Sequence, residues 1–403
     1  MRSVVFILAL ILRVAAIEAT GGEKIAFGDG VDYVRHARSL CSEGTYPERG
    51  NLPFFRAPGL PFFIAAVTAC HPEQTRLVKY ALAACDAATA VLLMMLAASL
   101  WGGAPRASLF AGLLAAVHPF FIGSAIDIRT EPLFMMLLVG AMLLLLRDRP
   151  AASGVALALA ALTRPTGLLC IPLFAIYAAR RRQDAGGPAG WKPALPLLIA
   201  AALTLSPWIA RNYLRFGELI VVNDAGGFNL WRGTHPELMR VVETHDPARF
   251  AHASWVFESQ TVSAAAAQVE SRASTPAARD REWKRMALEN VRRDPAFAVR
   301  ATLKKAALYW RPWLHPAEHS PKMIALSVVV ILGLYILGAL GLWRHPLRVP
   351  VLLFFAAMWL AHVAYFPSIR LRTPLTDPLL IAFAAGPLAS AAARLARRAA
   401  ARE

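Results

Sequence analysis

Long apolar runs are the feature that most constrains this chain. Most are about 17 to 23 residues long, the length a helix needs to cross a hydrocarbon core of about 30 Å. Of the 403 residues, 57% are hydrophobic and 17% are charged, which excludes an ordinary soluble globule. We therefore predict an all-α polytopic membrane protein with about ten transmembrane helices. The predicted spans are residues 4–19, 77–100, 107–124, 131–147, 151–163, 166–180, 193–210, 322–343, 349–366 and 375–393.

Basic residues between the spans predict the orientation. Cytoplasmic loops collect Lys and Arg, and here these residues gather near 106, 147–149, 180–192, 344–348 and 394–402. All of these basic segments fall on the cytoplasmic side if 151–163 and 166–180 are separate spans. One fused, kinked span would move everything downstream to the other side of the membrane. Both termini are then cytoplasmic, in a bacterial inner membrane. Since the net charge of +17 follows the spans, we expect a lipid bilayer as partner and no nucleic acid.

Two polar segments are too long to be turns, and both fall on the outer, periplasmic side: residues 20–76 and 211–320. They divide the chain into three parts. Residues 1–210 form a transmembrane catalytic module that includes the first loop, and residues 211–320 form a periplasmic loop domain. Residues 321–403 form the last spans and a basic cytoplasmic tail.

Local patterns place a few elements inside these loops. Residues 30–40 predict a short helix with Asp29 at its N-terminal end, and residues 53–63 are aromatic and rich in proline, which suits backbone lying in the interface. The second loop should close with a helix over 279–293, an N-cap at Asp294 and another helix toward Trp310. Residues 261–278 are rich in Ala and Ser and predict a poorly ordered stretch.

Four cysteines add little to this picture. Cys85 and Cys170 fall within spans and are expected to be small apolar fillers. Cys41 and Cys70 both fall on the outer side, where a disulfide is chemically permitted, but the sequence does not favour that bridge over two free thiols.

Charged residues gather at the outer ends of the predicted elements. Ionisable groups at such depths are costly unless they are paired or functional, and each one alone can be explained by snorkelling or a structural ion pair. Together they suit one reaction, displacement of a phosphate from the anomeric carbon of a sugar. A carboxylate takes the proton of the acceptor, and arginines hold the departing phosphate. The candidates are Asp29, Asp32, Arg56, Asp127, Arg129, Glu131, Arg164, Arg211, Arg370 and Arg372.

These residues lie in segments that resemble the GT-C glycosyltransferases, specifically bacterial relatives of the dolichyl-phosphate-mannose protein mannosyltransferases and of the lipid A aminoarabinose transferase. The resemblance runs through nearly the whole chain, and it depends on the order of the segments rather than on any single one. The segments are Asp29 to Tyr33 (DGVDY), Arg56 to Pro61 (RAPGLP), Pro207 to Tyr213 (PWIARNY), Gly226 to Trp231 (GGFNLW), Asn290 to Pro312 and Arg370 to Pro374 (RLRTP).

The resemblance implies a function. We expect transfer of a sugar from a polyprenyl-phosphate donor, of the undecaprenyl-phosphate kind, to a glycan, lipid or protein acceptor of the cell envelope. Asp29 matches the acid at the catalytic centre of such enzymes and Arg56 a position that faces the carrier phosphate. The expected catalytic residues are Asp29, Asp32 and Glu131; the expected substrate-binding residues are Tyr33, Arg56, Asp127, Arg129, Arg164, Arg211, Arg370 and Arg372.

The chain departs from the family pattern in two ways. Gly30 replaces the acid that usually follows Asp29, which leaves open whether a divalent cation, the one cofactor the resemblance suggests, is needed. No soluble domain follows the last predicted span, which removes a place where larger relatives engage acceptors. A ligase or polymerase with a diphosphate donor, a secondary transporter and a catalytically silent scaffold stay as alternatives. The sugar, the acceptor and the oligomeric state are not indicated by any residue.

Overall fold

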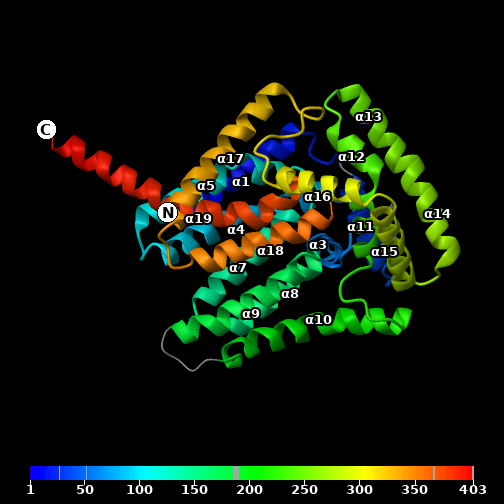
Figure 1. Cartoon of the computed structure of the whole chain (residues 1–403). Helices are drawn as coiled ribbons and strands as arrows, with labels where there is room; N and C mark the ends of the chain where they lie inside the picture. Colours follow the sequence, from blue (N-terminus) through cyan, green and yellow to red (C-terminus); the bar gives the residue numbers. More distant parts are fainter. Residues whose placement is uncertain (27, 51, 185–189, 366–367, 402–403) are drawn as a thin grey trace.

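The computed structural model describes residues 1–403 except 27, 51, 185–189, 366–367 and 402–403 (Figure 1). It is helical, and its described part contains no β-strand. The helices that coincide with the predicted spans are α1 (Arg2–Ala19), α4 (Thr75–Leu100), α5 (Pro105–Val117), α6 (Pro119–Ala125), α7 (Glu131–Leu146), α8 (Pro150–Thr163), α9 (Gly167–Asp184), α10 (Leu195–Phe216), α17 (Pro321–Leu342), α18 (Arg348–Ala364) and α19 (Ile369–Ala400). Parts of the predicted span 349–366 and of the basic segments near 180–192 and 394–402 lie outside the described residues.

Four of the described helices, α4, α10, α17 and α19, are long and apolar enough to cross a membrane. The pair α5 and α6 passes the same test together, although it bends by 51° at a break. Three further apolar helices, α7, α8 and α18, are shorter. The chain is therefore a multi-pass membrane protein, and the number of ten spans stays a prediction.

Two spans differ from their predicted form. The span predicted at 107–124 is broken at His118, because Pro119 begins a new helix and the residue before a proline avoids helical backbone. The last span begins at Ile369 rather than at 375. Its N-cap is Ser368, whose side chain accepts a hydrogen bond from the Arg370 amide (3.2 Å). Arg370 and Arg372 thus lie in the first turns of a helix and not in a loop.

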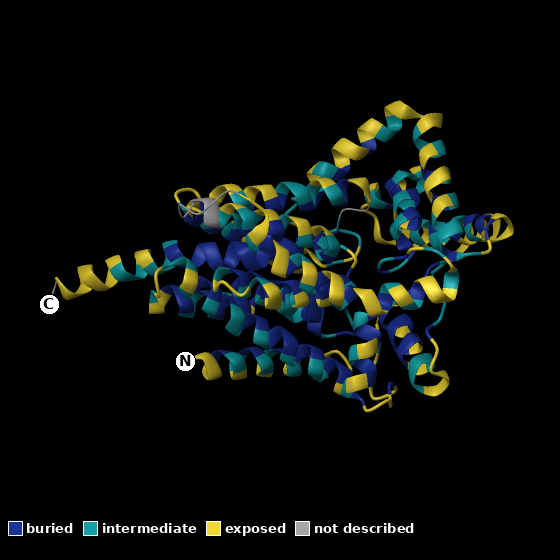
Figure 2. Ribbon diagram, turned by 90° about the horizontal axis from the view of Figure 1, so that it is seen from below, coloured by how far each residue is buried: buried dark blue, intermediate teal, exposed yellow. Residues whose placement is uncertain are grey.

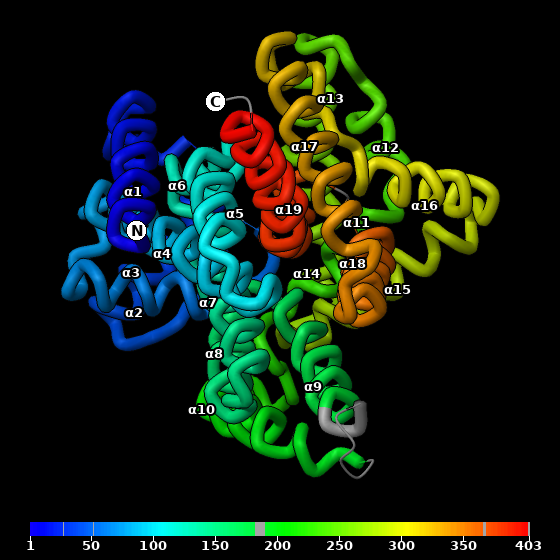
Figure 3. Tube along the Cα trace, turned by 90° about the vertical axis from the view of Figure 1, so that its left-hand side faces the viewer, coloured from blue at the N-terminus to red at the C-terminus, as the bar shows by residue number. Residues whose placement is uncertain are grey.

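The helices form one bundle with a helical cap at one end (Figures 1 and 2). Helix α4 is central, packing against α1, α5, α7 and α19, while α8 packs on α7 and α10. Figure 3 looks along the bundle and shows both α1 and the end of α19 on the near side. The two termini therefore lie at the same end, opposite the helices of residues 211–320.

The cap is built from the two predicted outer segments. The first contains α2 (Gly28–Glu43) and α3 (Gly59–Val67); the second contains α11 (Ala225–Thr234), α12 (Pro236–Glu243), α13 (Pro247–Val256), α14 (Val262–Arg272), α15 (Pro276–Arg293) and α16 (Pro295–Tyr309). Asp294 caps α16 as predicted, accepting a hydrogen bond from the Phe297 amide (2.8 Å). The prediction of a poorly ordered stretch at 261–278 is wrong, since most of it forms α14, whose Val262, Ala265 and Val269 are buried.

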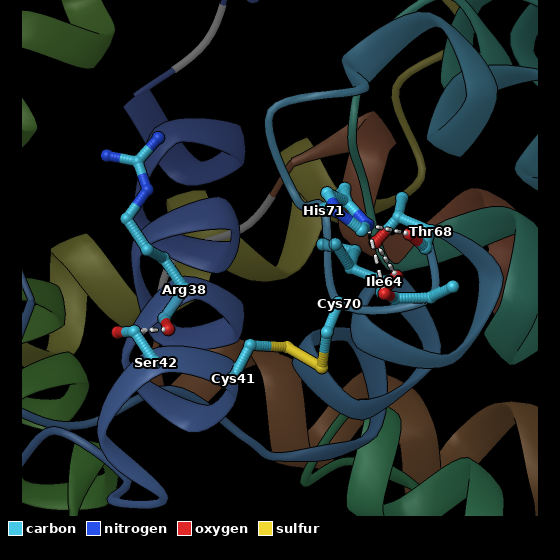
Figure 4. The surroundings of a disulfide bond; sticks show 8 residues. Arg38, Cys41, Ser42, Ile64, Thr68, Cys70 and His71 are labelled. Carbon is cyan, nitrogen blue, oxygen red and sulfur yellow. Dashed lines mark hydrogen bonds between the residues drawn. A yellow bond between two sulfur atoms is a disulfide. The ribbon is translucent and has the colours of Figure 1, made fainter.

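A disulfide joins Cys41 at the end of α2 to Cys70 just after α3 (Figure 4). The sequence did not favour this bridge. It forms because α3 folds back beside α2, which brings the two Cα atoms to 5.4 Å, within disulfide range. Cys85 and Cys170 are free and buried, as expected of apolar fillers.

A buried ion pair inside the bundle escaped the sequence analysis. Arg13 of α1 pairs with Asp86 of α4, and both side chains are fully buried. Arg13 also donates to the carbonyl oxygens of Ala116 (2.7 Å) and Ala115 (3.0 Å), at the end of α5. Pro119 has no amide hydrogen to offer the Ala115 carbonyl, which keeps a 3.4 Å contact with the His118 amide, so Arg13 supplies hydrogen bonds at the break that lipid cannot.

Candidate active site

The first part of the site is a contact between α2 and the segment before α3. Arg56 is 9% exposed, and its Nη2 donates to Asp29 Oδ1 (2.8 Å) and Asp32 Oδ2 (2.9 Å). Its Nε donates to the same Asp32 oxygen (3.1 Å). The two aspartates share one guanidinium because they are three residues apart on a helix and emerge on one side, as predicted.

The second part of the site comes from α7, α8 and α19. Arg370 donates through Nη1 to Asp29 Oδ2 (2.8 Å) and through Nε to Glu131 Oε1 (2.5 Å). Arg164 Nη1 lies 3.1 Å from the same Glu131 oxygen. Arg370 thus connects an aspartate near the N-terminus with a glutamate at the start of α7. We call the six residues Asp29, Asp32, Arg56, Glu131, Arg164 and Arg370 the ion-pair cluster.

Close backbone packing positions Arg56. A Cβ at Gly59 would lie 2.8 Å from the Thr163 amide nitrogen, so only glycine lets α3 approach the end of α8, next to Arg164. On the other side, His36 accepts a hydrogen bond from the Arg56 amide through Nε2 (3.3 Å). Its Nδ1 lies 2.7 Å from the Asp32 carbonyl and donates to it when the imidazole is neutral.

Asp29 is the cluster carboxylate whose two oxygens contact different arginines, and its side chain is 28% exposed. Burial raises the pKa of Asp29, but the charges of Arg56 and then Arg370 outweigh it, so the pKa lies below its ordinary value of 3.8. In this state Asp29 is ionised and a weak base. It becomes a stronger base when another anion takes its arginine partners.

Three other predicted residues lie beside the cluster. Tyr33 places its ring under Arg56, whose Cζ lies 5.2 Å from the ring centroid. Asp127 accepts hydrogen bonds from the amides of Ile128 (2.8 Å) and Ala26 (3.2 Å), which ties the start of α7 to the segment that leads into α2. Arg129 is partly buried, and burial followed by the nearby charge of Arg370 lowers its pKa.

The structure places two predicted residues away from the cluster. Arg211 on α10 donates to the Tyr46 carbonyl (3.0 Å) and stacks on Trp208. Arg372 is fully buried and donates to the Arg311 carbonyl (3.0 Å). Arg370 and Arg372 are two positions apart on one helix, so their side chains point in different directions and only Arg370 reaches the cluster.

Two cavities flank the cluster. The first has a volume of about 700 Å³ and lies between α3, α7, α8 and α10. Its lining is apolar apart from a few groups such as Arg211, and it includes Phe62 and Leu159, which are exposed on the outside of the bundle. It also includes Gly59 and Thr163, and so approaches Arg56 and Arg164.

The second cavity has a volume of about 570 Å³ and lies between α6, α12, α13, α17 and α19. Glu131 and Arg370 of the cluster line it directly, together with Arg129. Its opposite edge includes Met323 and Leu326 of α17, which face outward from the bundle. The cluster therefore lies between an apolar cavity and a mixed polar and apolar one.

The carboxylates of the cluster are not arranged as a metal site. In the described part of the chain, no group of three or more His, Cys, Asp and Glu side chains is placed to hold a metal ion. A divalent cation at Asp29 would have to displace Arg56 or Arg370 from a carboxylate oxygen. The residues present do not fit a resident metal at this position.

Two residues that support the cluster were missed by the sequence analysis. His36 holds the Arg56 backbone, and Thr130 accepts from Arg164 Nη1 (3.0 Å) while donating to Glu131 Oε2 (3.3 Å). His36 lies one turn after Asp32 on the predicted helix, a spacing that could have placed it on the same face. Thr130 gave no comparable signal.

Several solved structures are similar to this one. The oligosaccharyltransferase of Archaeoglobus fulgidus in complex with zinc and sulfate matches with a TM-score of 0.56 and 12% identity, over 98% of this chain and 50% of that chain. The same enzyme, AglB, in complex with an inhibitory peptide and a dolichol-phosphate matches with a TM-score of 0.55 and 12% identity, over 95% and 50%. ArnT of Cupriavidus metallidurans bound to undecaprenyl phosphate gives a TM-score of 0.45 and 17% identity, over 96% and 78%.

No family model matches the sequence, and no curated protein matches it by sequence. The chain spans about half the length of the oligosaccharyltransferase. The chain shares its fold with the Archaeoglobus fulgidus oligosaccharyltransferase, and the resemblance expected from the sequence is confirmed at the level of the fold.

Proposed function

We propose that this protein is a membrane glycosyltransferase that moves a sugar from a polyprenyl-phosphate carrier to a cell-envelope acceptor at the periplasmic face. One observation supports this most: Asp29 lies between Arg56 and Arg370, in a cluster flanked by a cavity on each side. The GT-C fold adds support, because AglB, which shares it, has been solved with a dolichol-phosphate.

The first cavity suits the donor. An isoprenoid chain is apolar throughout, as the lining is, and Phe62 and Leu159 give the cavity an edge on the membrane side. The carrier phosphate then lies near Arg56 and Arg164, which adjoin the lining residues Gly59 and Thr163. Arg211 offers one more cation along the wall.

The reaction follows from the charges. The acceptor hydroxyl attacks the anomeric carbon and gives its proton to Asp29, while the bond from that carbon to the phosphate oxygen breaks. The polyprenyl phosphate leaves with the electron pair, and its growing negative charge is held by arginines of the cluster. As the phosphate takes hydrogen bonds from Arg56 and Arg370, Asp29 loses the charges that lower its pKa. Donor binding thereby prepares the base.

Transfer by purified protein tests the proposal. Radiolabelled sugar on undecaprenyl phosphate is incubated with the full chain and a bacterial envelope extract, with Asp29→Asn as the inactive control. Incorporation by the wild type alone supports the function. No incorporation from any polyprenyl-phosphate sugar, together with transfer from a diphosphate-linked glycan, would replace it with the ligase alternative.

The orientation is tested separately with a reporter enzyme that is active only in the periplasm. It should work when fused after Gly233 or Pro316 and fail when fused after Arg182 or Arg398. Activity at Arg182 would mean that α8 and α9 do not form two crossings.

A further inference from the structure

The second cavity connects the ion-pair cluster to the lipid-facing side of the bundle. Its lining includes Glu131 and Arg370. It also includes Met323 and Leu326 of α17, which are 44% and 46% exposed on a helix long and apolar enough to span a membrane. A ligand in this cavity can keep an apolar part beside α17 while a polar part reaches the cluster.

The charged residues of this cavity favour an anionic ligand. Four arginines line it, Arg129, Arg232, Arg311 and Arg370, against three glutamates. Two of the glutamates are already paired: Glu131 with Arg370, and Glu258 with Arg232. The third is Glu318, so the lining residues carry four positive side chains against three negative ones, an excess of one positive charge.

Arg311 and Arg129 also have reasons of their own to bind an anion. The Nε of Arg311 is buried and has no hydrogen-bond partner within the described residues. The positive charge of Arg370 acts against that of Arg129, although the carboxylates of Glu131, Asp127 and Asp29 oppose this repulsion. An anionic group beside these arginines would give Arg311 an acceptor and reduce that repulsion.

We propose that the second cavity is the acceptor site, and that the acceptor is a membrane lipid with an anionic head group bound by Arg129 and Arg311. This inference rests on the proposed function and names the substrate class for it. A soluble sugar or a hydrophilic peptide would leave the apolar wall of α17 without a partner.

Gly123 of α6 offers a way to block this cavity without disturbing the fold. It lines the cavity, and a Cβ added to it meets no atom within 4 Å. Gly123→Leu should therefore fill the cavity. Gly333 of α17 is a matched control, because a Cβ there also meets nothing within 4 Å and the residue is outside the lining.

Retention of a defined lipid tests the site directly. The full-length protein is purified with an equal mixture of dioleoyl phosphatidic acid and dioleoyl phosphatidylcholine, with excess undecaprenyl phosphate to fill the donor site, and native mass spectrometry counts the lipids retained. We expect preferential retention of phosphatidic acid by the wild type. Loss of one charge-assisted contact in Arg311→Gln should lower that preference about tenfold. Gly123→Leu should lower it too, whereas Gly333→Leu and Arg300→Gln, which removes an exposed arginine of α16, should retain it.

The outcomes separate the two proposals. If Arg311→Gln and Gly123→Leu retain phosphatidic acid as well as their controls do, the acceptor site is not in this cavity. Equal retention of both lipids by the wild type would also overturn the inference. If undecaprenyl phosphate is not retained but the retention of phosphatidic acid depends on Arg311, the anionic lipid site is supported and the proposed donor is rejected. In a transfer assay, Gly123→Leu should raise the KM for the acceptor and leave the KM for the donor unchanged.

Discussion

Arg370 Nη1 lies 2.8 Å from Asp29 Oδ2, although 341 positions separate the two residues in the chain. The contact joins the first turn of α19 to the first turn of α2, so it closes the site across nearly the whole sequence. It also explains why Asp29 is a weak base in the absence of substrate: a second guanidinium holds its charged form.

Removing Arg370 should therefore change the pH dependence of the reaction. Without this cation the pKa of Asp29 rises, so the acidic limb of kcat/KM, which reports the free enzyme, should move to higher pH in Arg370→Gln. The pH profiles of wild type and variant, with Arg300→Gln as a charge-matched control, check this. An acidic limb at the same pH in both proteins would show that Asp29 is not the group that titrates.

Arg56 should affect the use of the donor. Arg56→Ala removes a cation from the phosphate and from both aspartates, so the KM for the lipid donor should rise and kcat should fall. Arg56→Lys should recover only part of the loss, because an ammonium cannot make the paired contacts of a guanidinium. The exposed Arg38 of α2, the helix that carries Asp29 and Asp32, provides the control Arg38→Ala. Unchanged donor kinetics in Arg56→Ala would reject the phosphate-binding role.

Asp224 should make the stability depend on pH. It is buried before α11 and its Oδ1 accepts from the Phe55 amide (3.1 Å), next to Arg56. Burial raises its pKa from 3.8 to about 7, although the Phe55 hydrogen bond and Arg279 oppose the shift. The folded state therefore holds a proton that the unfolded state has lost, and the stabilisation decreases as the pH rises from about 4 to about 7.

Asp224→Asn tests this relationship. The amide oxygen still accepts from Phe55, so the fold should survive while the pH dependence diminishes. The measurement is the thermal unfolding midpoint at pH 5 and at pH 8. Between pH 5 and pH 8 the unfolding midpoint should fall further in the wild type than in the variant. An equal fall in both would show that Asp224 is already ionised at pH 5.

Much of this arrangement could be predicted from the sequence, because it depends on local patterns. Apolar runs gave the helices of the bundle, and the three-residue spacing of Asp29 and Asp32 placed both on one side of α2. The charges at the outer ends of the helices predicted that acids and arginines would meet.

The features that could not be predicted from the sequence depend on how the helices rotate and pack. Arg372 is as basic as Arg370, but it points away from the cluster toward the carbonyl of Arg311. The partnership of Arg13 with Asp86 spans 73 positions and requires α1 to pack on α4. Similarly, the Cys41–Cys70 bridge requires α3 to fold back on α2, which no local pattern encodes.

That disulfide should stabilise the first outer segment. It closes a loop of 29 positions, for which chain entropy alone predicts about 3 to 4 kcal/mol. Cys41→Ser should therefore lower the thermal unfolding midpoint, and a reductant should do the same to the wild type but not to the variant. Cys85→Ser, at a free buried cysteine, controls for the loss of a thiol. An identical response of wild type and Cys41→Ser to reductant would show that the bridge is not formed.

Asp29 itself provides the most direct test of the mechanism. Asp29→Asn keeps the shape of the side chain but removes the site that accepts the proton, so turnover should fall by about 10² to 10⁴, the scale of general-base catalysis. Asp32→Asn should lower turnover less, because Asp32 is fully buried and contacts Arg56 rather than the open part of the site.

A purely structural role for Asp29 would be to stabilise the first turn of α2, and asparagine serves such a role about as well as aspartate. Asp246, which caps α13 by accepting from the Arg249 amide (2.8 Å), is the matched control: Asp246→Asn should leave both folding and turnover intact. If well-folded Asp29→Asn protein behaved like Asp246→Asn, Asp29 would be a structural residue. The base would then have to be sought at Asp32, Asp127 or Glu131, of which Glu131 lines the second cavity.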